Sequence, residues 1–331
     1  MNSLTHEIYN ELKAIYEHKI IRCDRASLFD QLNPNTQLLG IEKLINNTRF
    51  KYFPSHFSSL DNFKDKSLFD NSSKIINGEP VSIGAFPFMA SLGYLRLDGY
   101  FHSCGATIVT DQHVMTAAHC VNKLGNSYNY TDYFLSKNQV LVVIVGTNSI
   151  SGYNFLSLFQ SNDIYLVRTI SYNTAYTEVT SPADIAILKL DKKIVFNERI
   201  SKIRLGESND PSVIYGKKGI ITGWGYTEKG KISEWLLFGR VTVLNNQNNP
   251  DCSSFENTQY CLEDLSGRES NACFGDSGGP LLRFENNVWV QYGIASFVYT
   301  NPNSTCANQL PSFYAMVPVL KSWALDQIQS N

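Results

Sequence analysis

The sequence predicts an antiparallel all-β fold from residue 75 to the end of the chain, arranged as barrels or as a sandwich. Two patterns indicate it. Short runs rich in β-branched and aromatic residues recur between clusters of turn-forming residues, and strand patterns do not alternate regularly with helix patterns. The expected strands include residues 107–110, 140–145, 164–170, 185–190, 219–222, 240–244, 281–284 and 288–295.

Helical patterns mark the two ends of the chain. Residues 317–328 are expected to form a helix, because Pro318 suits a first turn and residues from Leu320 onward supply an apolar face. Residues 4–21 repeat apolar side chains at helical spacing and predict a second, amphipathic helix. The sequence then becomes polar, loses any period and ends in an exposed linker, so we expect residues 1–74 to form a separate segment.

Composition narrows the classes of function. Of the 331 residues, 43% are apolar and 18% are charged, which suits a globular protein with a sizeable core. The net charge of −2 argues against a polybasic protein that binds nucleic acid or a membrane through bulk charge. The apolar run at 140–145 is much shorter than the roughly 20 residues that a membrane-spanning helix needs. We therefore expect neither nucleic acid nor a membrane as a partner.

Three separate segments together contain the residue types that cleave an acyl bond. His119 stands in the run TAAHC, Asp184 in ADIAIL and Ser277 in CFGDSGGP. A serine hydroxyl is a poor nucleophile until a base takes its proton, and an acceptor must hold that base in one tautomer. The glycines around Ser277 let backbone N–H groups approach the oxygen that becomes negative during acyl transfer. These motifs predict nucleophilic catalysis by a serine.

The three motifs, together with Gly-Trp-Gly at residues 223–225, resemble the trypsin/chymotrypsin family of serine endopeptidases. The resemblance covers residues 75–331 and implies two six-stranded antiparallel β-barrels followed by a C-terminal helix. An unrelated α/β-hydrolase is disfavoured, because its triad follows the chain order Ser, Asp, His, whereas the order here is His119, Asp184, Ser277. The alternative from another class of function is a family member that has lost catalysis and serves as a binding protein.

The resemblance assigns a role to each motif residue. It implies that Ser277 is the nucleophile, that His119 is the general base and then the general acid, and that Asp184 orients and stabilises the imidazolium. The N–H groups of Gly275 and Ser277 are implied as the oxyanion hole. Ser296 matches the serine that supports the triad aspartate.

The resemblance also implies a latent enzyme. Family members begin at a new amino terminus that is released after Lys or Arg, and here Lys74 precedes the run IINGE. The freed ammonium group of Ile75 is expected to pair with Asp276, and a buried charge that lacks its partner costs about 3–5 kcal/mol. Residues 1–74 are therefore expected to be a propeptide, and the intact chain is expected to be nearly inactive.

His102 and Ser91 match positions that, in chymotrypsin-like zymogens, hold this aspartate away from its place in the active enzyme. We hypothesise that they restrain Asp276 in the same way. The alternative is that both are ordinary polar residues near a cysteine loop.

Specificity in this family depends on three positions of one pocket, which here are Asn271, Val298 and Ser312. Asn271 has no charge, so the side chain of a substrate Lys or Arg would be buried unpaired, and tryptic specificity is disfavoured. Val298 and Ser312 replace glycine, which predicts a narrow, elastase-like pocket for small or medium apolar residues. The alternative is a chymotrypsin-like preference for Phe, Tyr or Leu. The loop 297–305 is longer than usual and borders the pocket.

Seven cysteines form an odd set. The family pattern implies three disulfides, Cys104–Cys120, Cys252–Cys261 and Cys273–Cys306, which require an oxidising compartment. Cys23 has no evident partner and lies in the expected propeptide. Residues 1–20 do not read as a signal peptide, so we expect the leader of a secreted protein to be missing from this sequence. N-x-S/T sequons, which fit a secreted glycoprotein, occur at Asn46, Asn71, Asn129 and Asn303.

The expected partners are protein or peptide substrates, protein protease inhibitors and a separate activating protease. The activator is expected to be trypsin-like, because a narrow pocket of the elastase type does not accept Lys74. Neither a cofactor nor a metal ion is expected. The segment 146–160, which holds calcium in many digestive members of the family, contains no acidic residue.

Overall fold

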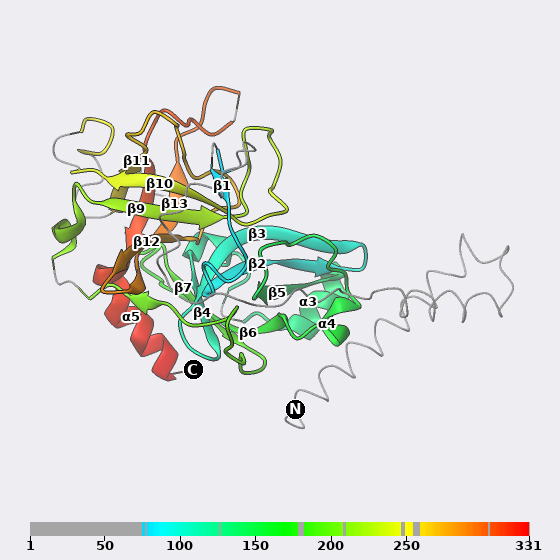
Figure 1. The fold of residues 1–331 in the computed structure, drawn as a ribbon. Helices are drawn as coiled ribbons and strands as arrows, with labels where there is room; N and C mark the ends of the chain where they lie inside the picture. Colours follow the sequence, from blue (N-terminus) through cyan, green and yellow to red (C-terminus); the bar gives the residue numbers. More distant parts are fainter. Residues whose placement is uncertain are drawn as a thin grey trace, which may run out of the picture. The chain divides into compact units, whose positions relative to one another are not determined.

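The computed structural model has the two-barrel fold that the resemblance implies (Figure 1). The described residues are 75–76, 78–125, 127–177, 182–207, 210–245, 249–253, 259–303 and 305–330. Several predictions fall outside them: the helix over 4–21, the linker before residue 75, Lys74, Cys23 and the sequons at Asn46 and Asn71.

The first barrel is closed by six antiparallel strands. They are β2 (Met89–Arg96), β3 (Gly99–Ile108), β4 (His113–Thr116), β5 (Gln139–Val145), β6 (Ile164–Tyr172) and β7 (Ala186–Leu190). Their order around the barrel is β2, β3, β4, β7, β6, β5, and β5 pairs back with β2. Aliphatic side chains such as Leu92, Val143 and Leu188 form its core, which accounts for the apolar runs in the sequence.

The second barrel has the same strand number. Its strands are β9 (Lys218–Gly223), β10 (Leu237–Val243), β11 (Gln259–Glu263), β12 (Pro280–Glu285), β13 (Val288–Val298) and β14 (Ser312–Met316). The order β9, β10, β11, β14, β13, β12 closes through the pairing of β12 with β9. Two short strands extend this sheet, β1 (Glu79–Pro80) beside β10 and β8 (Arg204–Leu205) beside β13. The prediction of two six-stranded barrels is confirmed.

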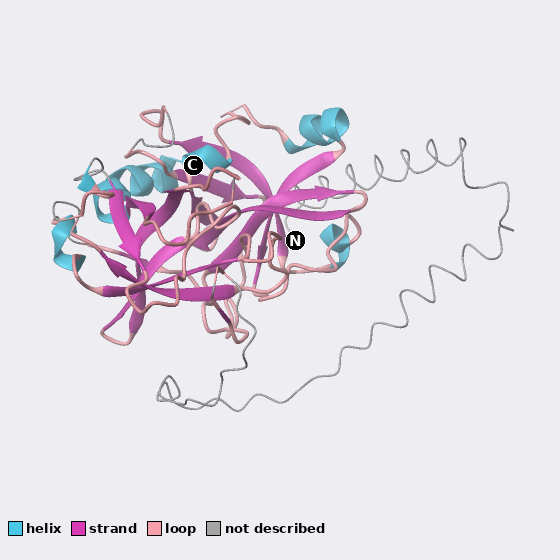
Figure 2. Cartoon of the chain, turned by 90° about the horizontal axis from the view of Figure 1, so that it is seen from above, coloured by secondary structure: helices cyan, strands magenta, loops and turns pink. Residues whose placement is uncertain are grey.

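A further apolar cluster joins the barrels to the C-terminal helix α5 (Val317–Ser330). It includes Met115 from the first barrel, Trp224 and Ile294 from the second, and Leu320 from α5. The helix also lies against β7, β8 and β13, so it braces both barrels. Figure 2 shows the remaining helices at the edge of the strand framework, and none of the described helices is long and apolar enough to cross a membrane.

The other described helices are short. They are α3 (Tyr130–Lys137), α4 (Ser157–Gln160) and the 3-10 helices η3 (Ala118–Cys120) and η4 (Pro211–Ile214). Asn129 caps α3, because its side-chain oxygen accepts from the N–H groups of Thr131 and Asp132. The six described cysteines pair as predicted, in the bridges Cys104–Cys120, Cys252–Cys261 and Cys273–Cys306.

Candidate active site

His119 and Asp184 are brought together by the pairing of β4 with β7. The two strands are antiparallel, with Thr116 opposite Ala186. His119 follows the end of β4 in the 3-10 helix η3, and Asp184 precedes the start of β7 by two residues. Because the end of one antiparallel strand lies beside the start of its partner, the two side chains meet at one end of the first barrel.

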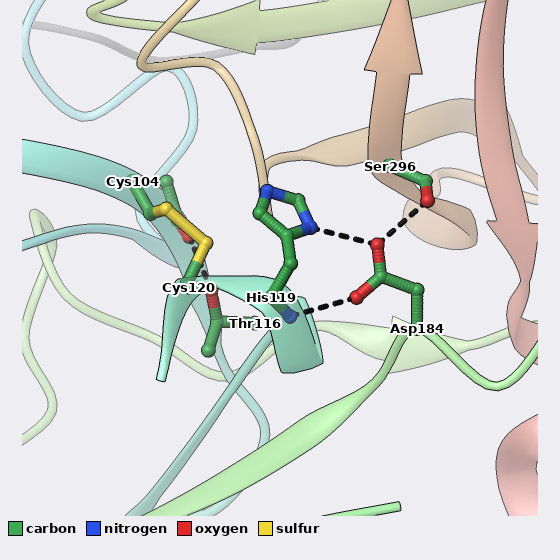
Figure 3. Close-up of polar contacts among 7 residues, drawn as sticks. Cys104, Thr116, His119, Cys120, Asp184 and Ser296 are labelled. Atoms are coloured by element: carbon green, nitrogen blue, oxygen red, sulfur yellow. Dashed lines mark hydrogen bonds and ion pairs between the residues drawn. A yellow bond between two sulfur atoms is a disulfide. The ribbon is translucent and has the colours of Figure 1, made fainter. Parts of the chain in front are cut away.

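Asp184 is fully buried and accepts three hydrogen bonds (Figure 3). One carboxylate oxygen accepts from the backbone N–H of His119 at 3.0 Å. The other lies 2.8 Å from His119 Nδ1 and accepts from the hydroxyl of Ser296 at 2.6 Å. An ionised carboxylate can only accept, so Nδ1 carries the imidazole proton and Nε2 keeps its lone pair. His119, whose side chain is 22% exposed, therefore has one nitrogen able to take a proton.

Ser296 reaches Asp184 from the second barrel through a bulge in β13. The pairing of β13 with β14 shifts register between Ala295 and Phe297, which leaves Ser296 as the extra residue. A bulge turns the side chain of its extra residue away from the regular alternation. The carboxylate is thus fixed by groups from both barrels, as Figure 3 shows.

Ser277 lies on a tight turn before β12. Its carbonyl accepts from the N–H of Gly105 in β3 at 2.7 Å. The N–H of the next residue, Gly278, donates to the carbonyl of Ala295 in β13 at 2.8 Å. The turn is therefore bonded to the first barrel on one side and to the second barrel on the other.

Gly278 allows this turn to approach the histidine segment. Its φ is +78°, and a Cβ built there would overlap Thr116 Oγ1. Thr116 ends β4, three residues before His119. On the other side the turn is bonded to Ala295, the residue before Ser296. The three predicted motif segments therefore converge on one place, although they are far apart in the sequence.

The peptide that precedes Gly275 is oriented by Tyr226. The N–H of Tyr226 donates to the carbonyl of Phe274 at 2.7 Å. In a trans peptide the C=O and N–H groups point in opposite directions, so the N–H of Gly275 points away from Tyr226. Gly275 has a φ of +95°, and a Cβ there would come within 2.8 Å of Ile232 Cδ1. Tyr226 is not recognisable from the sequence, because it contributes only a backbone N–H.

Asp276 occupies a space that only glycine leaves open. Its Oδ1 accepts from the N–H of Gly225 at 2.8 Å, and its Oδ2 accepts from the N–H of Cys273 at 3.0 Å. A Cβ on Gly223 or on Gly225 would overlap the carboxylate, which gives the Gly-Trp-Gly motif a physical reason. Burial raises the pKa of Asp276 to about 7, although these two hydrogen bonds oppose the shift. Among the described residues, no ion pair reaches this carboxylate.

The hypothesis that His102 and Ser91 restrain Asp276 is wrong for this conformation. His102 Nδ1 lies 2.7 Å from Ser91 Oγ, and its Nε2 lies 2.9 Å from the carbonyl oxygen of Gly275. Both carboxylate oxygens of Asp276 face backbone N–H groups instead. His102 therefore holds the residue beside the aspartate and not the aspartate itself.

Ile75 and Ile76 are buried beside the second barrel. Ile76 forms an isolated bridge with Asn271 and packs on the Cys273–Cys306 disulfide. Ile75 has a φ of +48°, a left-handed conformation that is strained for a β-branched residue. Ile76, the residue after the predicted new amino terminus, is thus bonded to Asn271, which belongs to the same segment as Asp276.

Two of the three predicted pocket residues, Val298 and Ser312, lie where β13 ends beside the start of β14, and the third, Asn271, forms the isolated bridge with Ile76. Val298 is directly opposite Ser312 in the antiparallel pair, so both side chains lie on the same face of the sheet. Asn271 is 4% exposed, and its amide is already occupied, donating to the Leu310 carbonyl and accepting from the Ala272 N–H, both at 2.8 Å. Ser312 is fully buried, and its hydroxyl has no hydrogen-bond partner within the described part of the chain.

The long loop 297–305 is anchored to the second barrel. The rings of Phe297 and Phe313 are stacked, with centroids 4.4 Å apart, and the ring of Tyr299 meets Phe313 edge-on. The hydroxyl of Tyr299 donates to the carbonyl of Asp251 at 3.0 Å. These contacts fix the part of the loop that borders Val298.

One group of potential metal ligands occurs within the described residues, and it consists of Cys104, His119 and Cys120. The two sulfur atoms are joined to each other, so neither is available as a thiolate ligand. The Nδ1 atom of His119 is bonded to Asp184. The chemistry of this group therefore suits proton transfer and not metal binding.

Comparison with known proteins agrees with the fold and the motifs. Residues 75–324 match the family model described as Trypsin. Trypsin theta of Drosophila melanogaster is 30% identical over 271 residues, covering 78% of this chain and 87% of that protein. CLIP domain-containing serine protease B4 of Anopheles gambiae is 27% identical over 277 residues, covering 78% of this chain and 71% of that protein. Chymotrypsin-C of Mus musculus is 28% identical over 271 residues, covering 78% of this chain and 90% of that protein. The chain belongs to the trypsin family and is a serine endopeptidase.

Proposed function

We propose that this enzyme is secreted as a zymogen and, once cut after Lys74, cleaves peptide bonds through His119, Asp184 and Ser277. The observation that carries the proposal is the buried Asp184 carboxylate, which fixes His119 with Nε2 free to accept a proton. The turn of Ser277 packs against the strand that leads to that histidine. The three disulfides support an oxidising, extracellular compartment.

Acylation begins when Ser277 Oγ attacks the carbonyl carbon of the substrate and its proton passes to His119 Nε2. The imidazolium that forms is stabilised by Asp184, which already accepts from Nδ1 at 2.8 Å. The substrate oxygen becomes negative as the tetrahedral intermediate forms. It accepts from the N–H groups of Gly275 and Ser277, which need no rearrangement at that moment.

Breakdown of the intermediate returns the proton. His119 Nε2 donates to the leaving amine, the peptide C–N bond breaks, and the acyl group stays on Ser277 as an ester. A water molecule then repeats the sequence, with His119 taking its proton and Ser277 leaving as the alcohol. Ser296 contributes by holding Asp184 in place from the second barrel, so the ring of His119 keeps one orientation through both steps.

Latency is proposed to come from Asp276. In the intact chain its carboxylate is buried beside the nucleophile without a cation among the described residues. Cleavage after Lys74 would supply the ammonium group of Ile75. The next residue, Ile76, is already bridged to Asn271, one of the predicted pocket residues. The ion pair would stabilise the conformation in which Gly275 and Ser277 present their N–H groups.

The pocket supports a preference for small or medium apolar residues before the scissile bond. Val298 and Ser312 lie side by side where glycines would leave the slot open. Asn271 cannot offer a charge, and its amide is occupied by Leu310 and Ala272. The names of the similar proteins include both a trypsin and a chymotrypsin, so the preference is argued from these side chains alone.

A panel of peptide p-nitroanilides that differ only in the residue before the scissile bond tests this preference. We expect kcat/KM to be highest for Ala, Val and Leu. Phe is expected to be about 10–100-fold poorer, since each methylene of fit is worth about 1–3 kcal/mol. Lys is expected to be the poorest, because its charge would be buried unpaired. Faster cleavage of Phe than of Val would favour the chymotrypsin-like alternative, and rapid cleavage of Lys would contradict both.

A double variant tests whether Val298 and Ser312 determine this preference. Replacing Val298→Gly and Ser312→Gly together is expected to raise kcat/KM for the Phe substrate by about 10-fold or more. Val195→Gly serves as the matched control, because Val195 is 75% exposed and lies outside the predicted pocket. An unchanged Phe/Ala ratio in the double variant would show that these two side chains do not set the width of the slot.

A further inference from the structure

Gly275 must present its N–H in one direction, yet a glycine has no side chain to hold it. Its φ of +95° lies in a region that glycine enters and leaves easily. The peptide before it is tied down by the bond from Tyr226 to the Phe274 carbonyl. The peptide after it is tied down by His102, whose Nε2 lies 2.9 Å from the carbonyl oxygen of Gly275. The N–H of Gly275 belongs to the first of these peptides, and fixing the second as well restrains both φ and ψ of Gly275, so the first peptide keeps its orientation relative to Asp276.

His102 is itself held by a chain of hydrogen bonds within the first barrel. Its Nδ1 lies 2.7 Å from Ser91 Oγ, and this oxygen lies 2.6 Å from the hydroxyl of Tyr100. Ser91 comes from β2, while Tyr100 and His102 come from β3. Gly93 makes room for the chain, because a Cβ there would come within 2.7 Å of the Tyr100 hydroxyl oxygen.

The Gly275 carbonyl, at one end of this series of hydrogen bonds, determines which partner is the donor in each of them. The carbonyl of Gly275 can only accept, so His102 Nε2 must donate. Burial lowers the pKa of His102 to about 4, so the ring is neutral at neutral pH and Nδ1 accepts from Ser91. The hydroxyl of Ser91 has then used its proton and accepts from Tyr100, whose pKa is raised by burial.

The surroundings keep His102 in position. Ser91 is fully buried, and the ring of His102 lies against the ring of Trp224, with centroids 5.9 Å apart. Trp224 stands between the two glycines that leave room for Asp276. The chain of hydrogen bonds therefore links the first barrel to the segment of the second barrel that carries the proposed oxyanion hole.

We infer that Tyr100, Ser91 and His102 form a positioning relay that holds the Gly275 carbonyl and thereby aims the Gly275 N–H at the oxyanion. The inference rests on the proposed oxyanion role of Gly275. None of the three residues touches the reacting atoms, so each acts through Gly275. Loss of the relay should weaken stabilisation of the tetrahedral intermediate without weakening binding of the substrate.

Activated His102→Ala enzyme tests the relay on a peptide p-nitroanilide and on the matching peptide trifluoromethyl ketone, which forms a tetrahedral adduct with serine. We expect kcat to fall by about 10–100-fold, less than or close to the loss of a whole oxyanion donor. KM should stay within about 2-fold, and the Ki of the ketone should rise in proportion to the loss of kcat/KM. His102→Gln, which restores an N–H donor toward Gly275, should recover most of the loss.

His113→Ala is the matched control, because His113 is also a histidine of the first barrel and its Nδ1 lies 2.8 Å from the hydroxyl of Thr110. It is expected to lower the unfolding temperature and to leave kcat and the ketone Ki unchanged. If His102→Ala does not fold, Ser91→Ala carries the test, with a loss of kcat of about 3-fold or more and a parallel rise in Ki.

A His102→Ala or Ser91→Ala enzyme that is less stable but keeps its kcat and its ketone Ki would overturn the relay. A fall in affinity for substrate alone would also overturn it. Phosphonylation of Ser277 in the wild-type enzyme separates this failure from failure of the proposed function. If Ser277 is labelled while the variants keep full activity, only the relay is lost; if Ser277 is not labelled, the proposed function is lost with it.

Discussion

Replacing Ser277 with alanine is expected to lower the kcat of the cleaved enzyme by about 10⁵–10⁶-fold. The variant keeps the fold, because the carbonyl and the neighbouring N–H that anchor the turn belong to the backbone. It removes the only group that can form the acyl-enzyme in the proposed mechanism. Steady-state hydrolysis of the best peptide substrate measures the loss, and the unfolding temperature reports that the fold is intact.

Two further variants make this test specific. Ser136→Ala changes an exposed serine of α3 and is expected to leave kcat unchanged. His119→Ala is expected to cost nearly as much as Ser277→Ala, and the double variant little more than either, because the two residues act as one unit. Additive losses would show that His119 and Ser277 do not work in one proton-transfer step.

Cleavage of the Lys74–Ile75 bond is expected to raise kcat/KM by about 10²–10⁴-fold, which corresponds to the cost of about 3–5 kcal/mol for a buried charge without its partner. The measurement compares the intact chain with the same chain after brief treatment with trypsin. Amino-terminal sequencing should give Ile-Ile-Asn-Gly, the residues from Ile75 onward. Lys74→Gln should resist the cut and stay inactive, and full activity of the uncut chain would contradict the account.

Cleavage of the Lys74–Ile75 bond should also alter how the free energy of unfolding depends on pH. In the uncut chain the pKa of Asp276 is raised to about 7 by burial, from an ordinary value near 3.8. The folded chain therefore binds a proton that the unfolded chain has lost, so its free energy of unfolding falls as pH rises between these values. Between pH 5 and pH 8 the titration of Asp276 should lower the free energy of unfolding of the uncut chain by about 2–3 kcal/mol.

After the cut, the paired ammonium should remove this loss, because it holds Asp276 ionised. Asp191, whose pKa burial also raises to about 6, contributes equally to both forms and cancels in their difference. Urea unfolding of the Ser277→Ala variant at pH 5 and pH 8, before and after the cut, gives that difference without self-digestion. Equal pH slopes for the two forms would show that no ion pair forms at Asp276.

Much of the fold could be predicted because the barrel strands leave a local signal. The run from Val140 to Val145 is buried throughout in β5, and the pattern alone locates it. Strands β2 and β11 are harder to recognise. In β2, Gly93 interrupts the pattern where the strand changes register against β3, and β11 is short and contains the polar residues Gln259 and Glu263. Their place depends on the partner strands and not on their own composition.

In the candidate site, too, some features have a local sequence signal and others depend on distant parts of the chain. The motifs predict His119, Asp184 and Ser277 as a catalytic set, since each stands in a run with few other uses. They did not reveal why the glycines of Gly-Trp-Gly are needed, which appears only when the Asp276 carboxylate is placed against them. The error about His102 has the same origin, because its bond to Gly275 joins residues 173 positions apart. Contacts between the two barrels cannot be read from either segment alone.

The central claim is that cutting after Lys74 turns Ser277 into a nucleophile. It is tested most directly by treating the intact chain and the cut chain with a fluorophosphonate and locating the adduct by peptide mass spectrometry. The account predicts one adduct, on Ser277, formed rapidly in the cut chain and at least about 100-fold more slowly in the intact chain, as the loss of a buried ion pair requires. Equal labelling of both forms, or an adduct on any other residue, would contradict it.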